Sequence, residues 1–402
     1  MWKRQPVHTV YGGAHLFKAD IAGKLGSTAL RTLDEHAPDA ATLATVLGIP
    51  APLADRVYVR VREKLHREPV EDFRLDFEDG YGSRPDTEED GHAEAAAVEM
   101  ASGARAGTLP PFIGIRIKNL GNELRDRALR TVDLFLGRLL KENKGQPPPH
   151  FVVTLPKITA RTQVGRLVDR LGRLETAHRV PHGTLKMELM IETPYSIFDE
   201  RGAVSLPALV AAGRGRIVAA HFGTYDYTAS LGITAAHQHM RHPACDFARS
   251  VMQVTLAGSD VCLSDGATNV LPVGKDPVVI HRAWRAHYDD IRHSLQNAFY
   301  QGWDLHPAQL VSRYAAVYTF FLEGLDAASE RLRNFVGRAA QATLVGEVFD
   351  DAATGQALLN FFLRALNCGA VKEEEVGALT GLTIDELRSG SFARIVNARR
   401  QT

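Results

Sequence analysis

Residues 73–82 read FRLDFEDGYG, a short run of apolar residues that ends in acidic ones. The run 73–77 has the length and the bulky side chains that are typical of a buried β-strand. An ionised group that is buried without a partner carries a large free-energy cost or changes its pKa. We therefore expect Asp76, Glu78 and Asp79 to mark the end of this strand, where the chain leaves the core.

The same arrangement recurs along the chain. Further short apolar runs are separated by amphipathic helical patterns such as 123–140 and 161–177. Strands that alternate with helices form parallel sheets, and seven or eight such units fit a (β/α)8 TIM barrel, of class α/β, better than an open sheet. Besides 73–77, the expected strands are 7–11, 112–117, 151–155, 186–191, 217–222 and 261–263.

Two additions to the barrel are expected. We predict that residues 1–310 form the catalytic barrel domain and that the charged, helical segment 20–70 is an insertion in it. From residue 311 the strand signal stops, so residues 311–402 are interpreted as a helical lid or oligomerisation region. Within this region, Thr383 and Glu386 have the spacing of a helix capping box. No glycine-rich nucleotide-binding fingerprint follows any expected strand.

The composition is that of an ordinary globular protein of 402 residues, of which 45% are hydrophobic and 23% charged. Because 47 Lys and Arg residues balance 47 Asp and Glu residues, the formal net charge argues against a general binder of nucleic acid or membrane surfaces. The three cysteines are scattered, which indicates a reducing compartment. We therefore expect a cytoplasmic enzyme without nucleic-acid or membrane partners.

Charged residues stand at or just after the ends of five expected strands. A TIM barrel opens all its carboxyl strand ends onto one face, where such enzymes place their active sites. Glu192 and Asp226 are separated carboxylates that suit Mg²⁺ or Mn²⁺, and Arg116 offers a planar cation to a carboxylate or an enolate. A metal and an arginine around one cavity fit a 2-oxo acid. Besides 76–79, the strand-end charges are Arg116, Lys118, Lys157, Glu192 and Asp226.

An ordered set of short motifs extends over residues 70–310. They are DFEDGYG (76–82), IRIKN (115–119), LPK (155–157), MIET (190–193), FGTYDYTASLG (222–232) and GWDLHPAQ (302–309). In order, spacing and strand context, the set resembles the citrate lyase beta-subunit-like group, or HpcH/HpaI aldolase family, of the phosphoenolpyruvate/pyruvate barrel superfamily.

The resemblance implies a Mg²⁺-dependent carbon–carbon lyase that assembles as a homotrimer or hexamer. It implies that Glu192 and Asp226 bind the metal and that Arg116 is a catalytic residue that holds the oxo acid or its enolate. It also assigns Asp76, Glu78 and Asp79 to the site, where they would organise Arg116. Lys157 would be a further catalytic residue. The backbone amides of Gly223 and Thr224 would contact the substrate.

Members of this group often use coenzyme A thioesters. Trp303 and Asp304 stand where many of them have a glycine and a lysine, so a coenzyme A thioester, a carrier-protein thioester and a free acid all stay open as substrates. In some thioester lyases a C-terminal helical lid supplies an aspartate to the neighbouring subunit. Asp350 or Asp351 is the candidate for that residue.

Three functions are considered. The leading one is retro-aldol or retro-Claisen cleavage of a hydroxy acid or its thioester to a 2-oxo acid, or the reverse reaction. The second is a phosphoenolpyruvate-type phosphoryl or mutase enzyme on the same barrel, although residues 264–272 (SDGATNVLP) lack the basic groups that a phosphate requires. The third is an inactive barrel used for binding or assembly, whose strand-end charges form structural ion pairs and in which Asp76 or Glu78 orients Arg116.

Overall fold

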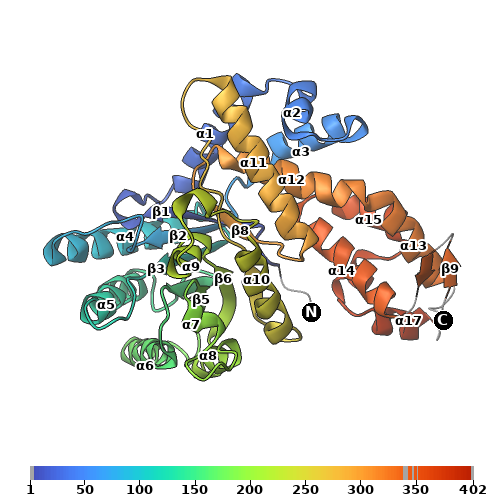
Figure 1. Cartoon of the computed structure of the whole chain (residues 1–402). Helices are drawn as coiled ribbons and strands as arrows, with labels where there is room; N and C mark the ends of the chain where they lie inside the picture. Colours follow the sequence, from blue (N-terminus) through green and yellow to red (C-terminus); the bar gives the residue numbers. More distant parts are fainter. Residues whose placement is uncertain (1–3, 338–342, 346–347, 351, 400–402) are drawn as a thin grey trace.

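The computed structural model describes residues 4–337, 343–345, 348–350 and 352–399, which contain an eight-stranded parallel sheet curved into a barrel (Figure 1). Strands β1 to β7 lie in sequence order, and β8 pairs with β1. The segment after β7 closes the ring, because the Trp303 N–H of β8 donates to the Gly266 carbonyl. The strands are β1 (His8–Gly13), β2 (Asp72–Asp76), β3 (Phe112–Arg116), β4 (Phe151–Leu155), β5 (Lys186–Ile191), β6 (Ile217–Phe222), β7 (Cys262–Ser264) and β8 (Gly302–Asp304).

The (β/α)8 fold predicted from the sequence is confirmed. All seven predicted strands are present, with bounds that differ from the prediction by two residues at most. The eighth strand was not predicted, because its three residues, Gly302–Asp304, include a glycine and a buried aspartate and lack an apolar run.

Helices cover the outer face of the barrel between successive strands (Figure 1). In α6 the side chains of Val164, Leu167 and Leu171 are fully buried, as their helical spacing predicted. The helices that follow β2 to β8 are α4 (Asp86–Ala106), α5 (Arg125–Glu142), α6 (Arg161–Ala177), α7 (Pro194–Ile197), α8 (Leu206–Ala212), α9 (Thr224–Ser230), α10 (Pro243–Leu256), α11 (Pro277–Gln296) and α12 (Gln309–Glu323). None of the helices in the described part of the chain has the length and apolar character that a membrane crossing requires.

The predicted helical insertion is present between β1 and β2. It consists of α1 (Ile21–His36), α2 (Ala40–Leu47) and α3 (Ala54–Arg67), and Figure 1 shows it beside α11 and α12. Helix α12 packs against α3 and α11, so it is buried along nearly its whole length.

The region predicted as a helical appendage, residues 311–402, begins inside α12, which is the barrel helix that follows β8. The helices beyond α12 lie to one side of the barrel (Figure 1). The capping box is confirmed, because Thr383 Oγ1 accepts from the Glu386 N–H at 3.2 Å and Glu386 Oε2 accepts from the Thr383 N–H at 2.8 Å. The expectation that strands end before residue 311 is wrong, because β9 (Thr343–Val345) and β10 (Val348–Asp350) form a short antiparallel pair. Asp350 ends β10, and Asp351 lies outside the described residues. The helices are α13 (Leu325–Gly337), α14 (Ala352–Cys368), α15 (Glu373–Thr380), α16 (Ile384–Arg388) and α17 (Phe392–Arg399).

Ionised side chains lie inside the barrel, contrary to the expectation that its strands carry charges only at their ends. Arg74 of β2 donates to Glu188 of β5 through Nε at 3.0 Å and Nη2 at 2.6 Å, and to Asp72 through Nη1 at 2.5 Å. Thr9 of β1 donates to Asp72 at 2.8 Å. Burial opposes the ionisation of Glu188, but Arg74 holds its pKa well below the usual value. Because each charge has a partner, the barrel tolerates them in place of apolar layers.

Candidate active site

A cavity of about 410 Å³ lies at the carboxyl ends of the strands. Every strand except β4 contributes a residue to it, directly or through the loop that follows, and β7 does so through Gly266 and Ala267. Of the residues predicted for the site, Asp76, Asp79, Arg116, Glu192, Gly223, Thr224 and Asp226 line the cavity, together with Tyr11, Gly80, Tyr225, Trp303 and Leu305. Glu78 and Lys157 lie behind this lining and contact it.

Asp76 fixes the position of Arg116. The two residues face each other in the register of β2 and β3, and Asp76 accepts from Arg116 Nε at 2.8 Å and from Nη2 at 2.5 Å. Asp76 also accepts from the backbone N–H groups of Glu78 at 2.9 Å and Gly80 at 2.6 Å. The carboxylate therefore orders both the guanidinium and the acidic loop. This agrees with the expectation that Asp76 or Glu78 orients Arg116.

Two aromatic rings lie close to the Arg116 guanidinium. Its carbon lies 4.9 Å from the ring centre of Tyr11 and 5.6 Å from that of Trp303, and the two rings are 4.3 Å apart. Trp303 Nε1 donates to Nδ1 of the buried His221 at 3.3 Å. These contacts favour a cation over the rings and hold Arg116 in a single orientation.

Glu192 is a buried carboxylate at the end of β5, with 2% of its surface exposed. Its Oε1 accepts from the Lys157 N–H at 2.7 Å. Burial raises the pKa of Glu192 to about 8, and the nearby Asp226 and Glu78 add to this effect while Arg116 opposes it. A cation bound close to Glu192 would lower this pKa again, because it favours the ionised carboxylate.

Gly223 allows Glu192 to sit against β6. A Cβ atom at position 223 would lie 2.6 Å from Glu192 Cβ and 2.5 Å from Oε2, so a larger residue does not fit. The Gly223 N–H donates to the Ile191 carbonyl at 3.0 Å and is therefore not free for a substrate, contrary to the sequence prediction. A contact between the Thr224 amide and a substrate stays a prediction.

Lys157 lies between Glu192 and the acidic residues Glu78, Asp79 and Asp226, and it contacts all four. Its backbone φ of 47° lies in the left-handed region, which side-chain-bearing residues rarely adopt. Its N–H faces Glu192, while its Nζ lies 2.8 Å from Glu78 Oε1, 2.8 Å from Asp79 Oδ1 and 3.7 Å from Asp226 Oδ2. Burial raises the pKa of Glu78 to about 7 despite Arg116 and Lys157.

The donor set fits a hard divalent cation. Glu192 and Asp226 present carboxylates to one cavity, and its lining contains no His or Cys. In the described part of the chain, no three or more His, Cys, Asp or Glu side chains form a ready-made metal cage. Mg²⁺ does not need one, because it is usually held by one or two carboxylates and keeps water or substrate oxygens as its other ligands.

One strand-end charge lies away from the cavity, and the two aromatic residues that contact Arg116 were not predicted for the site. Lys118 follows β3, but its Nζ donates to the Phe77 carbonyl at 2.7 Å and pairs with Glu89 at 2.9 Å, so it faces the helices and not the cavity. Tyr11 and Trp303 were missed because only charged strand-end residues were considered. The motif GWDLHPAQ did contain Trp303, and Tyr11 was the last residue of an expected strand.

Several solved structures share this fold. A citrate lyase from Burkholderia xenovorans LB400 superposes with a TM-score of 0.61 at 16% identity, over 94% of this chain and 97% of that chain. The malate synthase of Haloferax volcanii in its magnesium/glyoxylate complex gives a TM-score of 0.51 at 14% identity, over 99% of this chain and 98% of that chain. Its pyruvate/acetyl-CoA ternary complex gives 0.50 at 14% identity, over the whole of both chains. The predicted likeness to citrate lyase is thus confirmed at the level of the fold.

Comparison by sequence gives a family. No curated protein matches the chain. A family described as "Domain of unknown function (DUF6986)" matches residues 1–395, which include the barrel, the insertion and nearly all of the C-terminal helices. The chain therefore belongs to the DUF6986 family.

Proposed function

We propose that this protein is a Mg²⁺-dependent carbon–carbon lyase that cleaves a hydroxy acid or its thioester to a 2-oxo acid, or catalyses the reverse condensation. The observation that carries this proposal is the buried Glu192, which shares one cavity with Asp226 and Arg116. A citrate lyase and a malate synthase complexed with magnesium and glyoxylate share the fold, which supports chemistry of this kind.

Glu192 and Asp226 would hold Mg²⁺ or Mn²⁺. The metal, when bound, supplies a Lewis acid for the carbonyl and the enolate oxygen. Lys157 orients Glu192 through its backbone N–H, and Gly223 leaves the space that Glu192 occupies. These two neighbours therefore hold one carboxylate ready for the cation.

Arg116 would bind the carboxylate of the substrate and offset the negative charge that develops on oxygen during cleavage. Asp76 occupies Nε and Nη2, so Nη1 is the remaining donor group, 3.4 Å from Glu78 and 3.6 Å from Asp79. A cation that is already in place stabilises developing charge without reorganisation. Catalytic parts for Glu78 and Lys157 stay predictions.

The proposal also includes the roles of the two regions of the chain, the assembly, the localisation and the class of substrate. We place the catalytic function in residues 1–310 and a lid or oligomerisation role in residues 311–402 of a cytoplasmic homotrimer or hexamer. A coenzyme A thioester is one of the candidate substrates, beside a carrier-protein thioester and a free acid.

Oxalate, which mimics an enolate, provides the direct test. Calorimetry of the full chain should show oxalate binding that requires Mg²⁺, and Glu192→Gln or Asp226→Asn should reduce it at least about tenfold, because each removes a charged metal ligand. Asp260→Asn, at an exposed carboxylate outside the cavity, serves as the matched control. Absence of metal-dependent oxalate binding in the unmodified protein would contradict the proposal, and release of pyruvate, oxaloacetate or glyoxylate from a substrate panel would identify the product.

A further inference from the structure

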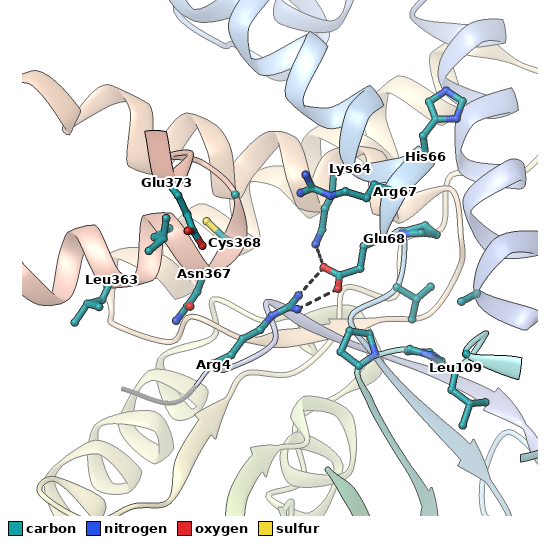
Figure 2. Close-up of a pocket in the computed structure, with 18 of the residues that line it drawn as sticks. Arg4, Lys64, His66, Arg67, Glu68, Leu109, Leu363, Asn367, Cys368 and Glu373 are labelled. Atoms are coloured by element: carbon teal, nitrogen blue, oxygen red, sulfur yellow. Dashed lines mark hydrogen bonds and ion pairs between the residues drawn. The ribbon is translucent and has the colours of Figure 1, made fainter. Parts of the chain in front are cut away.

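A second and larger hollow lies at the opposite end of the barrel (Figure 2). Its volume is about 1310 Å³, compared with about 410 Å³ for the candidate active site. Residues just before β1, β2 and β3 form one wall, and residues of α14 to α17 form the other. We call this hollow the basal cleft. It separates the barrel from the C-terminal helices.

The floor of the basal cleft is electrically balanced. Arg4 pairs with Glu68 through Nη1 at 3.0 Å and Nη2 at 2.6 Å, as Figure 2 shows. Lys64, which is 2% exposed, pairs with Glu68 at 2.5 Å and with Glu71 at 2.6 Å. The charges of these two cations and two carboxylates balance, so the floor carries no net charge for a ligand, although Arg4 Nε has no hydrogen-bond partner among the described residues.

Arg67 has no such partner. It is exposed at the end of α3 and forms no hydrogen bond or ion pair with a described residue, and Figure 2 shows its side chain among the residues that line the cleft. A Cβ atom at Gly369 would lie 3.7 Å from Arg67 Nη2, so the guanidinium stands next to the end of α14. Arg67 also borders an adjoining cavity of about 390 Å³. Its guanidinium is therefore open to a ligand from either hollow.

Arg394 presents a second guanidinium from the other wall. It is exposed on α17, and its side chain has no hydrogen-bond or ion-pair partner among the described residues. Of the acidic residues on this wall, Glu373 pairs with Arg388, and Asp385 lies in the first turn of α16, where the helix dipole favours a negative charge. The lining thus offers two unpaired guanidinium groups, one on each side of the cleft.

Apolar side chains also line the two walls of the cleft. Leu109, Pro110 and Pro111 line the barrel side, and Leu363 and Leu366 of α14 line the opposite side. Ligand sites usually combine apolar walls with a few placed polar groups, and most measure roughly 300–1,000 Å³, so a cleft of about 1310 Å³ has more room than one small ligand needs. A guanidinium recognises phosphate with two parallel hydrogen bonds. We infer that the basal cleft binds a phosphorylated small molecule of nucleotide type, with its phosphates on Arg67 and Arg394 and its apolar or planar part against these walls.

Such a ligand would join two parts of the chain. Arg67 belongs to the helical insertion of the barrel and Arg394 to the last helix, so one bound molecule would bridge them. Binding to the folded state alone stabilises it, so the ligand should raise the melting temperature of the full chain in a concentration-dependent manner. This site is independent of the proposed lyase function, because it lies at the amino ends of the strands.

Calorimetry of the full chain with ADP, pyrophosphate and adenosine tests the inference. ADP should bind more tightly than adenosine. Arg67→Ala and Arg394→Ala should each weaken ADP binding by about tenfold or more, because each removes hydrogen bonds to a charged group. Arg166→Ala, at an exposed arginine of α6 outside every cavity described, should bind ADP like the unmodified protein. Glu192→Gln should also bind ADP normally, which separates this cleft from the candidate active site.

Three results would overturn the inference. The first is that neither ADP nor pyrophosphate binds at millimolar concentration. The second is that Arg67→Ala and Arg394→Ala, shown by circular dichroism and thermal melting to be folded, bind ADP as tightly as the unmodified protein. The third is that Glu192→Gln loses ADP binding, which would place the ligand at the other end of the barrel.

Discussion

Asp76 and Arg116 are partners across adjacent parallel strands, and a single carboxylate holds the guanidinium through Nε at 2.8 Å and Nη2 at 2.5 Å. Because the strand register fixes both residues, the position of the cation does not depend on a loop. Its third nitrogen, Nη1, forms no close hydrogen bond with a described residue. The pair therefore couples a rigid strand geometry to a donor that stays available to a ligand.

Replacing Arg116 with lysine should impair binding although the charge is kept. A lysine cannot occupy both oxygens of Asp76 and still present a donor to the cavity. We expect the affinity for oxalate in the presence of Mg²⁺ to fall by about 10- to 100-fold, which corresponds to one or two charged hydrogen bonds. Arg130→Lys, at an exposed arginine that pairs with Asp90, should leave the affinity unchanged, and an equal loss in both variants would argue against a specific role for Arg116.

The contact between Gly223 and Glu192 predicts a second effect. In Gly223→Ala the new methyl group would collide with Glu192 Cβ, which cannot rotate away as the end of a flexible chain could. We expect a loss of about 1–3 kcal/mol in stability and weaker Mg²⁺-dependent oxalate binding. Gly165→Ala is the matched control, because nothing lies within 4 Å of its added Cβ in α6 and alanine favours the helix. Urea unfolding and calorimetry would compare the two variants.

Trp303 should report on the occupancy of the cavity. It lines the cavity, whereas Trp284 is fully buried and its Nε1 donates to the Ala308 carbonyl at 2.7 Å. We expect oxalate and Mg²⁺ to change the tryptophan fluorescence of the protein, and we expect Trp303→Phe to lose this change while it keeps a ring against Tyr11. A fluorescence response that persists in Trp303→Phe would show that the ligand binds elsewhere.

The buried carboxyl of Glu175, outside the cavity, should contribute to the dependence of the free energy of unfolding on pH in the acid range. Burial alone would raise the pKa of Glu175, but Arg216, at 2.6 and 2.7 Å, and the N–H groups of Gly183 and Leu185 lower it to about 2. A carboxyl with a lowered pKa stabilises the folded state above its ordinary pKa, and this contribution is lost as the pH falls from about 4.5 to about 2. Denaturant unfolding at several pH values would reveal this slope.

Glu175→Gln removes the ionised partner of the buried Arg216. At neutral pH we expect the free energy of unfolding to fall by about 3–5 kcal/mol, and we expect the part of the acid dependence that is due to Glu175 to disappear. Glu94→Gln, at an exposed residue of α4, should behave like the unmodified protein. If Glu175→Gln retained the full acid dependence, another carboxyl would have to be its source.

The sequence was sufficient for the barrel because its strands are short apolar runs separated by amphipathic helices. It was insufficient for β8, whose three residues carry no hydrophobic pattern, and for the hairpin β9–β10. Strand-end charges located most of the candidate site, since parallel strands bring their carboxyl ends together. The strand pattern does not show which way each strand-end side chain points. Lys118 and Arg116 are two positions apart, yet only Arg116 reaches the cavity.

The basal cleft could not be anticipated at all. It depends on how the C-terminal helices meet the amino ends of the strands, and no local pattern records that contact. Likewise, the sequence around Arg74 gives no partner for a charge in a buried strand, because that partner, Glu188, is 114 residues away along the chain. Long-range partners of this kind decide which charges a core accepts, and a single sequence does not show them.

The charged network inside the barrel also bears on how the chain reaches one fold. Apolar contacts have little directionality, so an apolar layer can adapt to a small displacement of one strand. Arg74 has no such freedom, because a shift of β2 or β5 would separate its guanidinium from Glu188 and leave both ionised groups unmatched in the core. The ion pairs of Arg74 with Asp72 and Glu188 therefore tie β2 and β5 to one relative alignment, at a free-energy cost for any other.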